Sequence, residues 1–451
     1  MKLRVFLAIF AILATGTWHL TAWAAPIAPL AAVDPDAPKE PQLAELQRAI
    51  EAFRQGEFAA ALEWLKRARQ KQPGLAPAPV MLANMHFSED QVVAGRSILE
   101  QAAVEFPDDP EPPLIFGDLA WRERRVSDAQ AQFLRGQQLL ESFSGDETRK
   151  HQLRVRAMMG LANVAEARGQ FRQAGKLFSQ VVAIEPQHGN AHFRLGNVLF
   201  ALDRPQQALA EFKRAKELSD AAPNPNLALA LLYHQSGKPD VAEKWFQRAI
   251  AEAPTDDEPR TAMARWQLEV RGNLPTAERH AQDAARLDPE SIEAPLVLGI
   301  VAICRGNHAR AEQFFAAVLK KSPGHFVASN HMAVALVEQG DADRRRQAQE
   351  LAHVLAQTYP HDSQAAATLG WVAFQVGDLN EAEKQLGRAI SAGSVSRDAA
   401  YYYARFLFKR GEIAKSKTFL QQALDGSGLF THHQQARDWQ KQFLGEQVAR
   451  Q

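Results

Sequence analysis

The sequence predicts an all-α fold, a solenoid of about eleven stacked helix-turn-helix repeats, and three patterns support this prediction. One small residue recurs every 34 residues or slightly more, a glycine usually precedes it, and a proline follows many of the repeats. Of the 451 residues, 46% are hydrophobic and 23% charged, which is typical of a folded chain. Lys plus Arg equals Asp plus Glu at 52 each, so no positive field favours nucleic acid as a partner.

Residues 1–24 have the pattern of a signal peptide. Lys2 and Arg4 form a short positive start, residues 5–14 are an unbroken apolar run, and Ala22-Trp23-Ala24 places small residues where a signal peptidase cleaves. We therefore expect cleavage after Ala24 and a chain that is exported to the periplasm or another extracytoplasmic compartment.

An uncleaved N-terminal anchor is the alternative, because residues 5–33 carry no formal charge and are long enough to span a bilayer. Membrane contact would then occur only through this segment. Polar residues and Gly16 dilute the apolar stretch, which favours cleavage. Residues 25–40 are rich in Pro and Ala and are expected to form an extended tether that leads into the fold.

The small recurring residue is expected to lie on the second helix of each repeat, where two helices pack closely. Its positions are Ala61, Gly95, Ala129, Ala174, Ala208, Ala242, Ala277, Ala311, Ala348, Ala382 and Ser416. Successive members lie 34, 34, 45, 34, 34, 35, 34, 37, 34 and 34 residues apart. Four residues later most repeats have Leu or Phe, and residues four apart share one face of a helix. The spacing therefore predicts both the helices and their buried face.

Turn residues separate the two helices of a repeat. Five residues before the small position most repeats have glycine, which tolerates the left-handed conformation of a tight turn, and Asp90 and Asp203 replace it in two repeats. Proline ends many repeats because its missing N–H stops a helix. These prolines are Pro73, Pro107, Pro186, Pro254, Pro289, Pro323 and Pro360.

The spacing divides the chain into repeats 1–3 over residues 41–141, an insertion at 142–150, and repeats 4–11 over 151–428. The insertion is expected to form a loop and an extended helix, either near a binding face or as a tolerated surface bulge. Three further residues are inserted near residues 341–346. Residues 429–451, with Trp439 and Phe443 four apart, are expected to form a C-terminal capping helix.

Residues 187–220 show the repeat most fully. Leu195, Gly196 and Leu199 lie on the first expected helix, and Ala208 and Phe212 on the second. This pattern resembles the tetratricopeptide repeat family over nearly all of residues 41–428. The resemblance implies a right-handed superhelix whose concave groove, lined by first-helix residues, binds a protein or a peptide.

The family pattern assigns a set of first-helix residues to this groove. They are Asn163, Asn197, Phe200, His234, Trp266, Asn330, Trp371, Phe374, Tyr401 and Arg405. An amide can donate to and accept from a peptide backbone at once, which favours the two asparagines of the middle repeats as partner-binding residues. The two tryptophans have two interpretations: they fill space between first helices, or they anchor an apolar side chain of a bound segment.

The sequence carries no P-loop, dinucleotide fingerprint, nucleophile elbow or paired-histidine metalloprotease helix. The single cysteine, Cys304, cannot form a disulfide or a cysteine zinc site within one chain and is interpreted as a small buried hydrophobe. Adjacent residues on a helix diverge by about 100°, so His432 and His433 are interpreted as surface residues rather than as metal ligands. We expect no enzyme activity, cofactor or metal.

The favoured function is a non-enzymatic scaffold or adaptor of the cell envelope that binds a peptide or partner protein. The alternative is an accessory scaffold of an exopolysaccharide synthesis or secretion complex, since exported tetratricopeptide proteins are similar to components of such machines. An enzyme with an unrecognised site is a third possibility, and a catalytic activity of the purified chain would reveal it.

Overall fold

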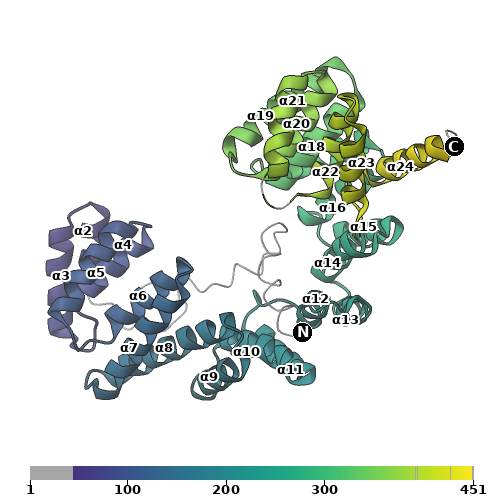
Figure 1. Ribbon diagram of the computed structural model, residues 1–451. Helices are drawn as coiled ribbons and strands as arrows, with labels where there is room; N and C mark the ends of the chain where they lie inside the picture. Colours follow the sequence, from purple (N-terminus) through teal and green to yellow (C-terminus); the bar gives the residue numbers. More distant parts are fainter. Residues whose placement is uncertain (1–43, 392, 394, 427, 449–451) are drawn as a thin grey trace. The chain divides into compact units, whose positions relative to one another are not determined.

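The computed structural model describes residues 44–448 except 392, 394 and 427, and these residues form helices joined by short turns with no strand among them (Figure 1). The predicted all-α solenoid of helical hairpins is thereby confirmed, while the handedness of the superhelix and the number of repeats stay predictions. The expected signal peptide and most of the tether lie outside the described residues. The chain divides into two compact units, Met1–Gln235 and Ser236–Gln451, which are described separately.

Even-numbered helices up to α22 are the first helices of the hairpins, and odd-numbered helices up to α23 are the second helices. The helices of the first unit are α2 (Ala44–Arg54), α3 (Phe58–Lys71), α4 (Ala78–Ser88), α5 (Val92–Glu105), α6 (Glu111–Arg122), α7 (Val126–Ser142), α8 (Glu147–Ala167), α9 (Phe171–Ile184), α10 (Gly189–Ala201), α11 (Pro205–Leu218) and α12 (Pro225–Gln235).

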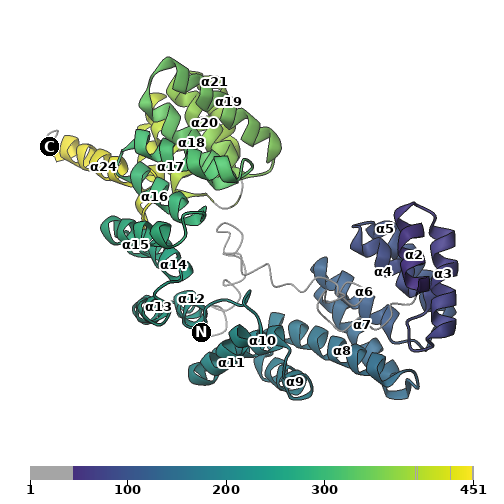
Figure 2. The ribbon, with the colours of Figure 1, turned by 180° about the vertical axis from the view of Figure 1, so that it is seen from behind.

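The second unit contains one π-helical turn besides its α-helices (Figure 2). Its elements are α13 (Pro239–Glu252), α14 (Glu258–Trp266), η3 (Gln267–Arg271), α15 (Leu274–Leu287), α16 (Glu293–Cys304), α17 (His308–Lys321), α18 (Phe326–Gln339), α19 (Ala342–Thr358), α20 (Ser363–Val376), α21 (Leu379–Ser391), α22 (Arg397–Lys409), α23 (Ile413–Leu424) and α24 (His433–Val448).

The recurring small residue lies on the second helices and is buried in each hairpin, as the spacing predicts. At Gly95 a Cβ atom would come within 2.7 Å of the Phe87 ring on the preceding first helix, so the two helices touch there. Ser416 is accommodated because its hydroxyl donates to the Ala404 carbonyl at 2.8 Å. The large residue four positions later packs against a glycine of the first helix, as Phe212 does against Gly196.

The hairpin turns have the predicted left-handed backbone. Glycine takes a positive φ in seven turns where the spacing places it, and Asp90 and Asp203 do so at 58° and 60°. Arg124 also has a φ of 58°, in a turn for which the sequence offered no left-handed residue. A non-glycine residue in this region costs about 1 kcal/mol, which the packing of the two helices has to offset.

Irregular spacings are absorbed by the helices themselves. Helix α7 runs to Ser142 and α8 begins at Glu147, so the insertion at 142–150 lengthens both helices and leaves a short linker. The three residues inserted before Ala348 extend the start of α19, whose N-cap Asp341 accepts a hydrogen bond from the Arg344 N–H. The one extra residue between Ala242 and Ala277 coincides with η3, because a π-turn holds one more residue than an α-turn.

Candidate functional site

Two ion pairs, two helical turns apart, join the first helices α6 and α8. Glu111 and Asp118 lie seven residues apart on α6, and Arg149 and Arg156 are spaced in the same way on α8. The Arg149 Nη2 atom lies 2.8 Å from Glu111 Oε2, and its guanidinium also donates to both carboxylate oxygens of Asp109 at 2.7 and 2.9 Å. Arg156 Nε donates to Asp118 Oδ2 at 2.7 Å. Successive first helices of this unit therefore lie side by side.

Arg149 belongs to the insertion at 142–150, yet its side chain is buried between two carboxylates. Burial alone would lower the pKa of Arg149, but the hydrogen bonds from Asp109 and the charge of Glu111 raise the pKa above its usual value. The guanidinium stays charged, and removing one partner of such a buried network is costly. The insertion thus contributes a structural contact, besides any surface that it forms.

Polar groups continue along the next first helices. Asn163 on α8 and Asn197 on α10 occupy equivalent positions 34 residues apart and are half-buried. Between them, Arg194 Nη2 lies 2.7 Å from Glu166 Oε2. In the described part of the chain, the buried Arg194 Nε and Asn190 Oδ1 atoms have no hydrogen-bond partner. This face therefore presents a donor and an acceptor that remain to be satisfied.

The charge of Glu166 is poorly solvated in this setting. Burial raises the pKa of the Glu166 carboxyl above its usual range, and the Arg194 guanidinium opposes this effect without cancelling it. A carboxylate in that position gains from any further N–H donor, such as a main-chain amide of a bound segment. We call the surface formed by Asn163, Glu166, Asn190, Arg194 and Asn197 the α8–α10 face.

The other two candidates of the first unit lie on the next helices. Phe200 on α10 meets the Tyr233 ring of α12 edge-on, with ring centroids 4.9 Å apart. His234 is half-buried on α12, and burial lowers the pKa of its imidazole, which favours the neutral form. A neutral imidazole can donate and accept one hydrogen bond each.

Most candidate residues of the second unit are interior. Trp266, Trp371 and Tyr401 expose only 1–2% of their surface, and Asn330 exposes 8%. The two tryptophans therefore fill space between helices. Burial also raises the pKa of Tyr401 to about 12, so its hydroxyl stays protonated. Of the two interpretations of the tryptophans, the structure fits packing.

Phe374 and Arg405 are half-buried and contact other side chains of the second unit. The Phe374 ring stacks on Trp371 with a centroid separation of 5.5 Å, and the Arg405 guanidinium lies 4.8 Å from the Trp439 ring centroid. Trp439 belongs to α24, which also covers the exposed end of α22 through Phe443 and Phe408. Helix α24 thus packs on the last hairpin.

The residues between α23 and α24 fold back over the first helices of the second unit. We call residues 428–432 the strap. The Leu429 N–H donates to the Leu268 carbonyl of η3 at 3.3 Å. The Cys304 thiol of α16 donates to the Phe430 carbonyl at 3.6 Å. The strap therefore reaches helices more than 120 residues earlier in the sequence.

Helix α22 holds the strap from the other side. Arg397 Nη1 donates to the Gly428 carbonyl at 3.1 Å, and the Arg397 guanidinium lies 5.1 Å from the Phe430 ring centroid. The Asp398 carboxylate accepts the Thr431 N–H at 3.1 Å. With the contacts to η3 and α16, three main-chain carbonyl or N–H groups of the strap are bonded to side chains and one to a main-chain carbonyl.

His432, the last strap residue, enters a buried cluster around Glu338 of α18. Its Nε2 atom lies 3.0 Å from Glu338 Oε1, which also accepts the Trp371 Nε1–H at 2.8 Å and the Gln375 Nε2–H at 3.0 Å. Burial favours the neutral acid, but the hydrogen bonds from His432 and Trp371 outweigh it and lower the pKa of Glu338. The imidazole stacks on the Tyr401 ring at 5.2 Å.

The interpretation of His432 and His433 as surface residues is wrong. They expose 2% and 8% of their surface, because the strap carries His432 against Glu338 and His433 begins α24. Cys304 is buried as expected, and burial raises the pKa of its thiol to about 12, which makes it unreactive. No local pattern could have shown that Phe430 and His432 contact helices so distant in sequence.

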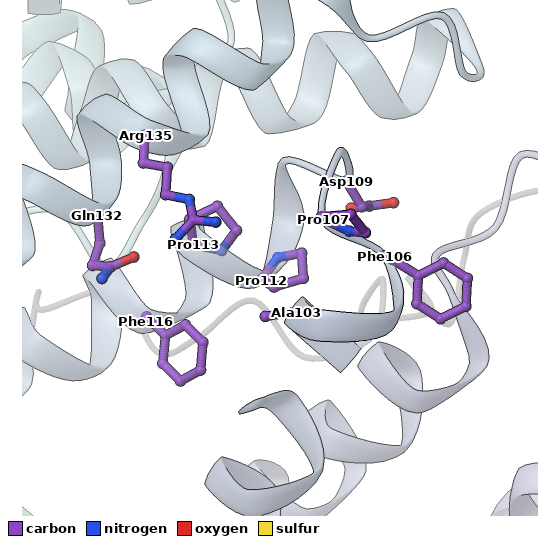
Figure 3. Close-up of a pocket in the computed structure, with 9 residues that line it drawn as sticks. All are labelled: Ala103, Phe106, Pro107, Asp109, Pro112, Pro113, Phe116, Gln132 and Arg135. Atoms are coloured by element: carbon purple, nitrogen blue, oxygen red, sulfur yellow. The ribbon is translucent and has the colours of Figure 1, made fainter. Parts of the chain in front are cut away.

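A small pocket lies at the turn between α5 and α6 in the first unit (Figure 3). Phe106, Pro107, Pro112 and Phe116 form much of its wall, and Arg135 of α7 approaches from the other side (Figure 3). Its volume is about 90 Å³, well below the roughly 300 Å³ of typical ligand pockets. It can hold one small apolar side chain but no cofactor.

Two further properties hold for the described residues. They contain no group of three or more His, Cys, Asp or Glu side chains placed to bind one metal ion. Within the same part of the chain, no helix combines the length and the apolar character that a membrane crossing requires.

Two family models, both described as tetratricopeptide repeat, match the chain. One matches residues 159–224, 268–326 and 367–428, and the other matches residues 52–115 and 199–265. Together the matches cover more than half of the chain, on both units.

Among curated proteins, the chain is similar to the protein O-mannosyl-transferase TMTC3 of Homo sapiens, with 24% identity over 272 residues. The match covers 56% of this chain and 29% of the human protein. The mouse protein of the same name matches at 24% identity over 237 residues, 49% of this chain and 25% of that protein. The chain thus spans less than a third of the length of these relatives.

Among solved structures, the chain is similar to yeast Tom70, with 16% identity, coverage of 90% of this chain and 96% of that chain, and a TM-score of 0.35. It is also similar to the APC/C hetero-tetramer Cut9–Hcn1, with 11% identity, coverage of 84% and 93%, and a TM-score of 0.38. These values are too low to bear on function.

Proposed function

Because the chain belongs to the tetratricopeptide repeat family, we propose that it is a protein-interaction scaffold that binds an extended segment of a partner protein on the α8–α10 face of its first unit. Tetratricopeptide proteins generally bind protein partners, and the fold is typically a non-catalytic scaffold. The transferase activity in the name of the mannosyl-transferase relatives belongs to those proteins, which are more than three times as long as the matched region.

The observation that carries this proposal is the set of unsatisfied polar groups on the α8–α10 face. The Arg194 Nε–H and Asn190 Oδ1 lack partners among the described residues, and Asn163 and Asn197 present half-exposed amides one repeat apart. An extended segment offers main-chain N–H and C=O groups in alternation, which amides and a carboxylate can pair without regard to sequence. Phe200 and His234 lie on the neighbouring helices and would contact side chains of the same segment.

Site-specific photocrosslinking tests the proposal. A photoreactive amino acid placed at Asn197 should capture a discrete partner in native host cells, and the adduct should weaken when Arg194 is changed to Met. The control carries the same group at Lys213, an exposed position on α11, the second helix of the same hairpin. Equal capture of the same protein from both positions, or from Lys213 alone, would remove the α8–α10 face as the binding site.

We further propose that the chain acts outside the cytoplasm, in the cell envelope. Lys2, Arg4, the apolar run at residues 5–14 and the Ala22-Trp23-Ala24 site support this location. N-terminal sequencing of the native protein should find Ala25 first. An intact N-terminus in the membrane fraction would instead indicate an anchored protein, and an intact N-terminus in the cytosol would exclude export.

A further inference from the structure

The strap has the features of a bound peptide ligand rather than those of an interhelical turn. It is non-helical, whereas the other connections within the second unit are tight turns, and it touches η3, α16, α18, α20 and α22. Its main-chain groups are bonded to helices of this unit at four places. Main-chain bonding that is independent of sequence, with side chains adding specificity, is how protein surfaces bind extended peptides.

Two strap side chains supply the specificity. The Phe430 ring lies between the Arg397 guanidinium and the Tyr401 ring, at centroid distances of 5.1 and 6.1 Å. Two residues later, His432 bonds to Glu338 and packs edge-on against Trp371 at 5.2 Å. The surface therefore selects an aromatic residue followed, after one intervening residue, by a hydrogen-bond donor such as histidine.

Gly428 fixes where the strap enters this surface. Its φ is +82°, and a Cβ atom at this position would collide with the carbonyl oxygen of Glu269 in η3. Gly426 also has a positive φ, +99°, but nothing lies within 4 Å of the position its Cβ would take. The two glycines share a backbone requirement and differ in whether the chain contacts the helix surface, so they form a matched pair.

We propose that the first-helix surface of the second unit is a second peptide-binding site, and that the chain keeps it covered with its own strap, residues 428–432. Release of the strap opens the site to an extended segment with a Phe-x-His pattern. This site is separate from the α8–α10 face, so neither proposal depends on the other. A tethered segment has an effective concentration on the order of millimolar, so it excludes a free peptide at micromolar concentration.

The probe is a fluorescent synthetic peptide with the sequence of residues 426–434, added to the full-length chain. Because the peptide keeps its glycine, it can occupy the surface even when the tethered strap cannot. Gly428→Ala should displace the strap, so that the peptide binds this variant at least about tenfold more tightly than the wild type. Gly426→Ala should bind like the wild type. A peptide with both Phe430 and His432 replaced by Ala should bind none of the three proteins.

Hydrogen exchange of the strap amides establishes whether the strap has left the surface. Exposed strap amides in Gly428→Ala without binding of the peptide would show that the strap only caps the fold, and would overturn the proposal. Strap amides as protected as in the wild type would overturn it too, because the contact of Gly428 with Glu269 would then not hold the strap. If Gly428→Ala does not fold, the Phe430→Ala, His432→Ala double variant takes its place, with the same two readouts and the same refuting results.

Discussion

Replacing Trp371 by alanine is expected to destabilise the second unit by about 4 kcal/mol. The ring is 2% exposed, stacks on Tyr402 with centroids 4.5 Å apart, and donates its Nε1–H to Glu338. A buried tryptophan removes about 200 Å² from water, and at about 25 cal/mol per Å² this contributes about 5 kcal/mol. Partial collapse of the cavity reduces the loss. Glu338 keeps Gln375 and His432 as donors, so it adds little to the cost.

Trp371→Phe separates the two contributions. It keeps most of the apolar ring and removes only the N–H that bonds to the Glu338 carboxylate. A hydrogen bond to a charged group contributes about 1.5–3 kcal/mol, and the two remaining donors lower that value, so we expect a loss of about 1–2 kcal/mol. The ordering wild type, Phe, Ala in stability is the signature of a tryptophan that fills space.

Hydrogen exchange measured by mass spectrometry provides the assay, because it resolves the two units in one sample. Opening of α18, α20 and α22 should become easier in Trp371→Ala, while α6 to α10 keep their protection, since stacked repeats transmit perturbations mainly to neighbours. Unchanged protection of α18 and α20 would refute the packing role. A Phe variant as unstable as the Ala variant would show that the N–H, and not the ring, provides the stability.

Three further predictions follow from buried groups. Ala208→Arg should cost on the order of 3 kcal/mol by overpacking and charge burial, and hydrogen exchange should show the α10–α11 hairpin opening first. Arg149→Met should cost about 3 kcal/mol, because it leaves two carboxylates buried without their partner, and urea unfolding measures the loss. Burial, aided by Arg437 and Arg397, lowers the pKa of His433 to about 4. The unfolded chain then binds the proton more readily, so the second unit should lose about 2 kcal/mol as pH falls from about 6.5 to 4, and His433→Gln should flatten that dependence in thermal melts.

The repeat and its turns could be predicted because their determinants are local in sequence. The small residue at Ala208 and the large one at Phe212 lie one helical turn apart, and the left-handed Asp203 lies five residues before Ala208. Arg124 was not recognised as a left-handed residue, because nothing in its side chain favours that conformation. The π-turn after Trp266 appeared in the sequence only as a spacing of 35 instead of 34.

The candidate binding residues were harder to predict, because exposure depends on what covers a helix face. Asn163 and Trp371 occupy the same repeat position, yet one is half-buried and the other is interior. The difference arises from the strap, whose His432 packs on Trp371, and from Tyr402, which stacks beneath it. Family positions identify which residues can face a partner, and they do not reveal that a distant segment already lies there.

The two units therefore use the same hairpin for two different surfaces. In the first unit, the α8–α10 face retains unsatisfied polar groups, which favours main-chain contacts with a partner that approaches from solvent. In the second unit, the corresponding helices satisfy Glu338 with His432 and hold Phe430 over Arg397, so a partner must first displace the strap. Since energetic effects in stacked hairpins decay over neighbouring repeats, opening the second surface should leave affinity at the first nearly unchanged. A partner with one extended segment would engage the first unit directly, and a partner with a Phe-x-His segment would gain the second contact only where it outcompetes the strap.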